Sequence, residues 1–375
     1  MSFVYLDHAA TSFPKSAAVF EAAKEAFFTC GNSGRGGHPL AMKAAETVYA
    51  CREALAELFG STPENVIITS GATAALNMAI KGLAPKKGEA LCSALEHNSV
   101  LRPLYSAFPK RLQIVTPCFN SREQTAMTVL KLLKKNVGLM VLCHASNLCG
   151  ICLPVKELCT EARRKGIPTV LDCAQSAGHI PINIADLEAD IICIPAHKGL
   201  GGAMGVGALI VNPESGIKIK PIIEGGTGVA AREKEMPPML PERLEAGTAN
   251  ITGIAALTAA VKGLDFNRKE EELRQQAVRR LKAVKGVKVY ATGWDGGYAP
   301  VVAFNVKDVP SDKVAAMLAE RGIYVRGGLH CAPLAHEALG TGKYGAVRAS
   351  FGKGNSEEDV DTLLTAVEEI ANGGF

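Results

Sequence analysis

The feature that most limits the folds open to this chain is the alternation of residue patterns through its middle. Short apolar runs are separated by amphipathic stretches with helical spacing. Because parallel strands need long crossover connections, this alternation favours a mostly parallel sheet with helices on both faces. The expected strands are residues 66–69, 89–93, 112–116, 137–143, 169–171, 190–194 and 207–211, and the expected helices are 43–58, 72–82, 124–134 and 155–165.

After residue 252 the pattern changes to one charged helix and then a mixture of short strands and helices. A smaller α+β unit is therefore predicted. We expect a large domain over residues 15–252 and a small domain over 253–375, which also includes residues 1–14. A chain of 375 residues is long enough for both. The expected elements of the small unit are 269–284, 287–290, 301–306, 312–321, 323–326, 347–351 and a last helix from 357 to about 371.

Charge and composition exclude several classes of function. The 41 basic and 37 acidic residues give a net charge of only +4, which argues against a surface for nucleic acid or acidic membranes. There is no apolar run of membrane-spanning length and no basic-then-apolar leader before Tyr5. A cytoplasmic protein is therefore expected, and its 11 cysteines are expected to be reduced thiols.

Two segments indicate the chemistry. Lys198 follows His197 directly after an apolar run and is itself followed by glycines. A lysine held at a strand end by small residues can form a Schiff base with an aldehyde cofactor, although a solvated loop lysine has the same local sequence. Upstream, another apolar run ends at Asp172. Pyridoxal phosphate needs such a carboxylate to keep its ring nitrogen protonated, so the two segments together predict a pyridoxal phosphate site.

With these segments in view, the chain resembles the class V aminotransferase superfamily, and within it the branch of cysteine desulfurases and selenocysteine lyases. The resemblance extends from the Tyr-Leu-Asp-His-Ala-Ala-Thr segment at 5–11 to the Val-Arg-Ala-Ser-Phe segment at 347–351. It implies the fold type I of pyridoxal phosphate-dependent transferases, an α/β fold with a seven-stranded, mostly parallel sheet in the large domain. Its most specific parts are Asp172-x-x-Gln175, His197-Lys198 and Arg-Gly-Gly-Leu-His-Cys-Ala at 326–332.

The resemblance also implies how the phosphate would be bound. Ala72 and Thr73 open a helix, where backbone N–H groups suit a phosphate, although an ordinary helix cap has the same pattern. Thr248 would reach the phosphate of a neighbouring subunit, which implies a homodimer. One departure from the family is Pro195, which stands where a serine is common and which lacks both hydroxyl and N–H. His197 would then carry more of the phosphate binding.

Three further residues are implied around the cofactor ring. His97 would stack on the ring and move protons on the bound substrate, whereas a buried structural histidine is the alternative from sequence alone. Gln175 would hydrogen-bond the phenolic oxygen of the ring. Asn147 would hold either that oxygen or the carboxylate of the substrate.

The substrate would be bound by arginines. Arg348 lies on a strand-like run, and its planar guanidinium can pair with a carboxylate through two hydrogen bonds. It is therefore the candidate clamp for an α-amino acid, with a solvated edge-strand arginine as the alternative. Arg35 matches a second active-site arginine in similar chains.

Cys331 separates the reactions of the superfamily. It precedes Pro333, a residue suited to the first position of a helix, so its sulfur is expected near a helix N-terminus. The helix dipole and the neighbouring His330 are both expected to favour the thiolate. Among similar proteins, a cysteine at this place marks desulfurases that take sulfur as a persulfide. The short step from Cys331 to Arg348 is similar to the ordered loop of the second desulfurase group.

We therefore predict a pyridoxal phosphate-dependent cysteine desulfurase with Lys198, His97 and Cys331 as its catalytic residues. It would convert L-cysteine to L-alanine, leave a persulfide on Cys331 and pass the sulfur to a protein acceptor. Two alternatives stay open, and no metal site is part of the main prediction. A selenocysteine lyase, or another lyase or epimerase of the superfamily, would bind L-selenocysteine or a related amino acid through the same clamp. A metal or redox module without the cofactor would use Cys143, Cys149, Cys152 and Cys159, although no second paired half of a zinc site follows.

Overall fold

A seven-stranded sheet forms the centre of the molecule, which a computed structural model describes over residues 3–34, 36–307 and 309–373. β8 runs antiparallel to both of its neighbours, and the other neighbouring strands are parallel. The prediction of a mostly parallel sheet is thus confirmed. In spatial order the strands are β2 (Val66–Thr69), β8 (Gly207–Val211), β7 (Ile191–Pro195), β6 (Thr169–Asp172), β5 (Val137–Cys143), β3 (Glu89–Ser93) and β4 (Leu112–Val115).

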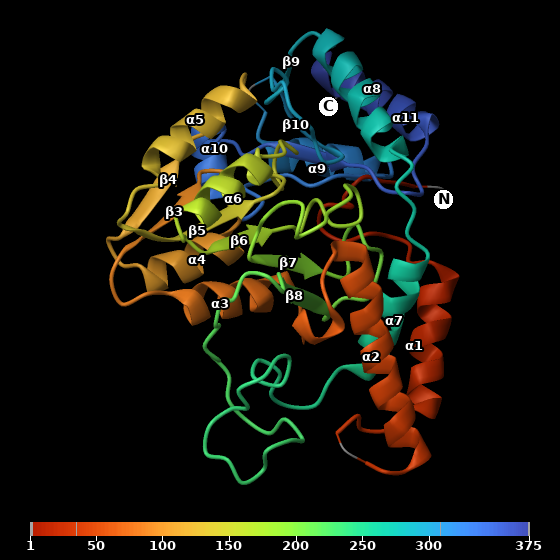
Figure 1. Ribbon diagram of the computed structural model, residues 1–375. Helices are drawn as coiled ribbons and strands as arrows, with labels where there is room; N and C mark the ends of the chain where they lie inside the picture. Colours follow the sequence, from red (N-terminus) through yellow and green to blue (C-terminus); the bar gives the residue numbers. More distant parts are fainter. Residues whose placement is uncertain (1–2, 35, 308, 374–375) are drawn as a thin grey trace.

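The strands are continuous apolar runs because both faces of this sheet are covered. Every residue of β7 is buried, and its side chains alternate between two cores. Ile191 and Cys193 pack into the core on one face, whereas Ile192 and Ile194 pack into the core on the other. Figure 1 shows α3 and α4 below the sheet and α5 and α6 above it. These helices are α3 (Ala72–Leu83), α4 (Asn98–Ala107), α5 (Arg122–Leu132) and α6 (Val155–Arg164).

A second, smaller unit has its own core around Phe304, Phe351 and Leu363. Its antiparallel sheet has the order β12-β10-β9, and helices α8, α9 and α11 pack against it. β1 pairs in parallel with β11, which joins the N-terminus of the chain to this unit. The elements are β1 (Val4–Tyr5), α8 (Lys269–Ala283), β9 (Val287–Val289), β10 (Val301–Val306), α9 (Ser311–Glu320), β11 (Ile323–Tyr324), α10 (Pro333–Leu339), β12 (Val347–Ser350) and α11 (Glu357–Ala371).

Three further helices, α1 (Ala17–Thr29), α2 (Pro39–Phe59) and α7 (Ile251–Lys262), pack on one another beside the large sheet (Figure 1). Of these, only α2 is predicted from the sequence, and its predicted range of 43–58 is too short. α1 is missed because its large apolar side chains do not mark a buried face: Phe20, Phe27 and Phe28 are all exposed. The expected domain boundary at residue 252 falls within α7, and the division into domains stays a prediction.

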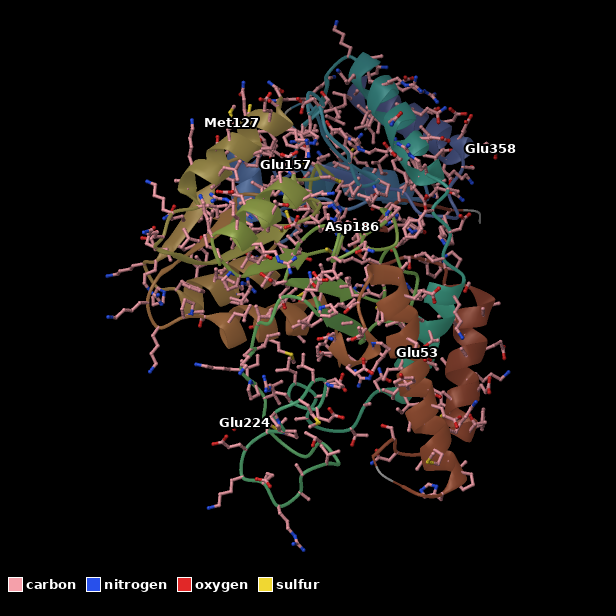
Figure 2. The ribbon with its side chains drawn as sticks, in the orientation of Figure 1. Glu53, Met127, Glu157, Asp186, Glu224 and Glu358 are labelled. Carbon is pink, nitrogen blue, oxygen red and sulfur yellow. The ribbon has the colours of Figure 1, made fainter. Side chains whose placement is uncertain are left out.

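Between β8 and α7, residues 212–250 form neither helix nor strand. Figure 1 shows this segment extending below the body of the molecule, on the same side as the connection between α1 and α2. Figure 2 shows the side chain of Glu224 on it, directed away from the sheet. None of the helices in the described part of the chain has the length and apolarity needed to cross a membrane.

Candidate active site

A cavity of about 340 Å³ lies where β2, β3, β5, β6 and β7 end. These strands run in the same direction, so the segments that follow them meet at one edge of the sheet, which is where open α/β sheets bind ligands. The cavity gathers eight of the residues that the sequence predicts for cofactor binding. They are Ala72, Thr73, His97, Asn147, Asp172, Gln175, His197 and Lys198.

Lys198 and Asp172 both line this cavity, and the charge of each affects the pKa of the other. Burial lowers the pKa of the Lys198 amine to about 8, with the negative charge of Asp172 opposing this shift and the positive charge of Arg348 adding to it. Burial raises the pKa of Asp172, against the effects of the Ala174 N–H group, which donates to Oδ1 over 2.9 Å, and of the Lys198 charge. A cationic partner for Asp172 and an aldehyde for the Lys198 amine would therefore both be favourable.

The start of α3 lines another wall of the cavity. Its N-cap is Gly71, which has a φ of 145° and supplies no side chain to accept from the first N–H groups of the helix. The backbone N–H groups of Ala72 and Thr73 are therefore available to an anion. Pro195, at the end of β7, also lines the cavity and offers neither hydroxyl nor N–H to such an anion.

His97 follows β3 and caps the N-terminus of α4. Its Nδ1 accepts from Ser99 N over 3.0 Å and lies 2.7 Å from Ser99 Oγ, which can donate or accept. Burial, together with the positive charges of Lys198 and Arg348, lowers the pKa of His97 to about 4. The imidazole is therefore neutral at pH 7, which makes it a proton acceptor rather than a permanent cation.

The N-terminal segment 7–15 closes one side of the cavity. Gln175 Nε2 donates to Ala9 O over 2.9 Å. The carbonyl oxygen of His197, immediately before Lys198, accepts from Ser12 N over 2.8 Å, Ser12 Oγ over 3.1 Å and Lys15 Nζ over 2.8 Å. Thr11 Oγ1 adds a donor at 3.1 Å. Several donors on one carbonyl hold the peptide bond that carries Lys198 in a fixed orientation.

Arg348 and Asn147 lie side by side at the junction of the two units. Arg348 is on β12 and is buried, with Nη1 donating to Asn147 O over 3.0 Å and Nη2 donating to Asp7 Oδ1 over 2.9 Å. The side chain of Asn147 donates from Nδ2 to His330 O over 2.8 Å. Its buried Oδ1 has no hydrogen-bond partner within the described ranges and is free for a ligand.

Cys331 has the one exposed thiol among the cysteines that the structure describes. Its carbonyl oxygen accepts from Asn98 N over 2.7 Å, next to His97, so its segment is attached to the rim of the cavity. Both His330 and Cys331 have left-handed backbones, with φ values of 50° and 54°. Such a conformation is unfavourable for residues other than glycine and is held by these contacts.

The expectation that His330 favours the thiolate of Cys331 stays a prediction, and a positive charge on His330 does not support it. Burial and the charge of Arg348 lower the pKa of His330 to about 3, so its ring is neutral at pH 7. Its Nε2 is 2.9 Å from Ala346 O, to which the neutral ring donates. α10 begins at Pro333, two residues after Cys331, so the position of the cysteine just before a helix agrees with the sequence prediction.

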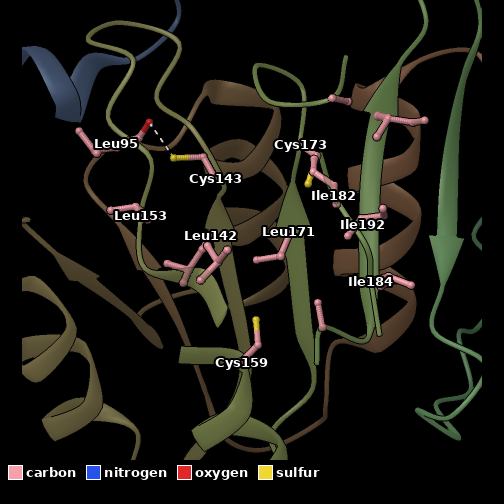
Figure 3. Close-up of a cluster of buried hydrophobic side chains, with 14 of the residues drawn as sticks. Leu95, Leu142, Cys143, Leu153, Cys159, Leu171, Cys173, Ile182, Ile184 and Ile192 are labelled. Atoms are coloured by element: carbon pink, nitrogen blue, oxygen red, sulfur yellow. Dashed lines mark hydrogen bonds between the residues drawn. The ribbon is translucent and has the colours of Figure 1, made fainter. Parts of the chain in front are cut away.

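The other cysteines are less suited to chemistry. Figure 3 shows Cys143, Cys159 and Cys173 among leucine and isoleucine side chains, with Cys143 Sγ hydrogen-bonded to Leu95 O. Burial raises the pKa of Cys152 and that of Cys159 to about 12, and the pKa of Cys149 is also raised. These thiols stay protonated at pH 7, which removes support from a metal or redox module built on them.

Three predicted site residues that the structure describes do not line the cavity: Arg348, Cys331 and Thr248. Arg348 and Cys331 lie next to it through the contacts given above. Thr248 is exposed on the segment between β8 and α7 and does not line the cavity of its own chain. Arg35 lies outside the described residues. Their roles stay predictions, and the position of Thr248 is compatible with contact to a second subunit.

Sequence reasoning gives no role to three charged residues that the structure brings to the site. Asp7 pairs with Arg348, and Lys15 holds the His197 carbonyl. Glu96 is fully buried beneath His97, with Oε1 accepting from Ser93 Oγ over 2.6 Å and Cys143 N over 2.9 Å. The one sequence signal for Glu96 is a carboxylate directly after an apolar run. Asp7 has the same signal, since it directly follows the apolar run at 3–6, whereas Lys15 has none.

The chain was compared with known families and proteins. The family model "Aminotransferase class-V" matches residues 4–363. The chain is 32% identical to a probable cysteine desulfurase of Pyrococcus abyssi, over 98% of this chain and 94% of that protein. It is also 32% identical to a probable cysteine desulfurase of Halalkalibacterium halodurans, over 98% of this chain and 92% of that protein.

The fold is similar to those of solved cysteine desulfurases. The fold is similar to the apo structure of a cysteine desulfurase from Thermococcus onnurineus NA1, with a TM-score of 0.88, 30% identity, and coverage of 99% of this chain and 95% of that one. It is also similar to a cysteine desulfurase from Escherichia coli in its S-sulfonic acid form, with a TM-score of 0.85, 27% identity, and coverage of 99% and 95%.

Proposed function

We propose that this chain, which belongs to the class V aminotransferase family, is a pyridoxal phosphate-dependent cysteine desulfurase. The observation that carries the proposal is an exposed thiol, Cys331, fastened to the rim of a cavity that contains the Lys198 amine and the Asp172 carboxylate. The names of the similar proteins support L-cysteine as the substrate and L-alanine as the product.

The residues of the cavity fit pyridoxal phosphate. The uncapped start of α3 suits the phosphate, and the Lys198 amine suits the aldehyde because its pKa is lowered to about 8. Two buried polar atoms, Asn147 Oδ1 and His197 Nδ1, have no hydrogen-bond partner in the part of the chain described and would receive one from the ligand. When bound, the cofactor supplies an electron sink, and Asp172 would keep its ring nitrogen protonated.

The substrate would be held and its protons moved by residues of this chain. Arg348 would bind the α-carboxylate through its guanidinium. The Lys198 amine, with its pKa lowered to about 8, would take the Cα proton of the substrate. His97, which is neutral because its pKa is about 4, would accept the proton of the Cys331 thiol.

The sulfur step forms one bond and breaks one. The Cys331 thiolate attacks the sulfur of L-cysteine, and an S–S bond forms as the substrate C–S bond breaks. The electron pair of that bond stays with the carbon skeleton, which takes up a proton and leaves as L-alanine. Cys331 is left as a persulfide. Because its thiol is exposed, we further propose a protein thiol as the acceptor of this sulfur.

The test is a Cys331→Ala variant of the holoenzyme, with Cys118→Ala as a control for loss of a partly exposed thiol elsewhere. Cys331→Ala should retain cofactor and L-cysteine binding and lose L-alanine and persulfide formation more than about a hundredfold. Undiminished L-alanine formation would refute the role of Cys331. A persulfide mapped by mass spectrometry to Cys149 or Cys152 would move the sulfur path to another loop.

A selenocysteine lyase remains a second candidate, since L-selenocysteine would use the same arginine and lysine. A selenol leaves more readily than a thiol, so the two functions differ in their need for Cys331. Release of selenide from L-selenocysteine that persists in Cys331→Ala, with loss of L-alanine formation from L-cysteine, would identify a lyase activity that does not depend on the thiol.

We also propose a homodimer. Two features support it: the extended segment that carries the exposed Thr248, and the exposed face of α1 with Phe20, Phe27 and Phe28. Large apolar side chains exposed together on one helix are typical of an interface. Light scattering should give a dimer for the wild type and for Met127→Glu, which alters an exposed methionine on α5 (Figure 2), and a monomer for Phe27→Glu. A dimeric Phe27→Glu would argue against this surface.

A cytoplasmic location completes the proposal. The 11 cysteines are all free thiols. Reduced thiols in this number are typical of proteins from a reducing compartment. Fractionation of cells that produce the full chain tests the location.

A further inference from the structure

One carboxylate, that of Asp7, serves two arginines at the substrate end of the site. Its Oδ1 accepts from Arg348 Nη2 over 2.9 Å, and its Oδ2 accepts from Arg326 Nε over 3.0 Å and pairs with Arg326 Nη2 at 2.9 Å. The two arginines are neighbours because Arg326 and Arg348 are paired across an antiparallel bridge. Two positive charges therefore face one negative charge, and one positive charge is left uncompensated.

Arg348 is the less solvated of the two. Its side chain is 4% exposed, against 50% for Arg326. Besides Asp7, it donates from Nη1 to Asn147 O, a neutral acceptor. Its Nε is buried and lacks a hydrogen-bond partner among the residues described. The guanidinium thus has one unused N–H donor, and its positive charge is only partly neutralised by Asp7. Both can be satisfied by a second carboxylate.

We infer that Asp7 is a built-in counter-ion that pairs with Arg348 in place of the substrate carboxylate and thereby lowers the affinity of the enzyme for its amino acid. The inference rests on the proposed function, in which Arg348 binds that carboxylate. In this inference Asp7 changes substrate affinity through its pairing with Arg348, so it is a positioning residue and not a catalytic one.

The direction of the effect follows from burial. A buried guanidinium without a counter-ion is unfavourable, so Asp7 stabilises the free enzyme. In the complex the substrate carboxylate supplies the compensation, and Asp7 contributes less. The free energy of binding is the difference between the complex and the free enzyme. A residue that stabilises the free enzyme more than the complex therefore weakens binding. Removal of the Asp7 charge should therefore tighten binding and destabilise the free protein.

The cluster acts on the reaction centre as well. The positive charges of Arg348 and Arg326 lower the pKa of Lys198, and the negative charge of Asp7 raises it. Arg348, Arg326 and Asp7 are therefore all close enough to the Lys198 amine for their charges to affect it. A ligand carboxylate that binds between them would sit within the same range.

The test is a titration of the Asp7→Asn holoenzyme with L-alanine, which carries the carboxylate and amine but no sulfur, followed by the visible absorbance of the cofactor. L-alanine should bind about tenfold more tightly than to the wild type. Cysteamine, which lacks a carboxylate, should bind to both with the same affinity. Arg326→Gln should weaken L-alanine binding, because Asp7 then pairs with Arg348 only and neutralises its charge more fully.

Two further readouts separate this inference from a structural role of Asp7. The apo-protein of Asp7→Asn should unfold at a lower temperature, and L-alanine should raise the unfolding temperature of its holoenzyme more than that of the wild type. For L-cysteine, KM should fall without a rise in kcat. Weaker or unchanged L-alanine binding in Asp7→Asn would overturn the inference.

Arg348→Gln distinguishes failure of the inference from failure of the proposed function. Loss of L-alanine binding in Arg348→Gln, with weaker binding in Asp7→Asn, would overturn the role of Asp7 alone. Unchanged L-alanine binding in Arg348→Gln would overturn the arginine clamp and the role of Asp7 together.

Discussion

Glu96 offers a test of the electrostatics beneath the active site. Its carboxyl is fully buried, and only Oε1 has hydrogen-bond donors, from Ser93 and Cys143, in the described structure. Burial raises the pKa of Glu96 to about 8, with the nearby charge of Asp172 adding to the effect and the two donors opposing it. The carboxyl is therefore mostly protonated at pH 7, and its unpartnered Oε2 is the natural site of the proton.

The raised pKa makes stability depend on pH. Between the unfolded pKa of 4.5 and the folded pKa of about 8, the folded state binds the proton and the unfolded state does not. The stabilisation is fully present below pH 4.5 and is lost as pH rises through 8. A shift of this size corresponds to at most roughly 5 kcal/mol. Glu96→Gln keeps the shape of the neutral acid and cannot ionise, so it should remove this loss.

The assay is urea unfolding of the apo-protein at pH 5.5, 7 and 8.5. The wild type should lose stability over this range more steeply than Glu96→Gln, whereas Glu53→Gln, at an exposed position on α2 (Figure 2), should behave as the wild type does. Glu96→Ala should be unstable at every pH because Ser93 and Cys143 lose their acceptor. A Glu96→Gln variant as unstable as Glu96→Ala at pH 5.5 would show that the carboxyl is ionised and would refute this reasoning.

Two more predictions concern the lysines of the site. Because the folded pKa of Lys198 is about 8 and its ordinary value 10.5, the apo-protein should gain up to about 3 kcal/mol as pH rises between these values, and Lys198→Met should not. Parallel pH profiles of unfolding for the two proteins would contradict this. Lys15→Met should weaken cofactor binding about tenfold in equilibrium dialysis, because the His197 carbonyl loses its charged donor. The exposed Lys24→Met serves as the control, and an equal effect of both would exclude the role of Lys15.

The large sheet could be predicted from the sequence because its strands are buried on both faces. β5 and β8 are uninterrupted apolar runs, and their predicted bounds agree with the structure. α1 and α4 could not be predicted in this way. α4 contains Pro103, which is unusual inside a helix, and the phenylalanines of α1 are exposed. The spacing of apolar residues predicts a helix or strand only where those residues are buried within the same chain.

The active site shows the same division. Lys198 and Asp172 could be found because each follows a recognisable apolar run, and strand ends converge at one edge of a parallel sheet. Asp7 could not be paired with Arg348 from the sequence, since 341 residues separate them and only the folding of the N-terminus onto the small unit brings them together. His330 is the opposite case. The sequence shows a histidine beside Cys331, but it does not show the burial that lowers the pKa of that histidine.

Ser99 determines how His97 could act as the base that the proposed function assigns to it. When Nδ1 accepts from Ser99 N, the ring proton is on Nε2, and His97 offers a donor to the cavity. When Nδ1 donates to Ser99 Oγ, Nε2 is unprotonated and can accept the thiol proton. Both partners belong to one residue, at 3.0 and 2.7 Å, so the change of tautomer exchanges one hydrogen bond for another. Ser99→Ala would keep the N–H and lose the hydroxyl. It should therefore slow transfer of the thiol proton while leaving substrate binding intact, and an unchanged rate of persulfide formation in a single turnover would exclude the exchange of tautomers at Ser99.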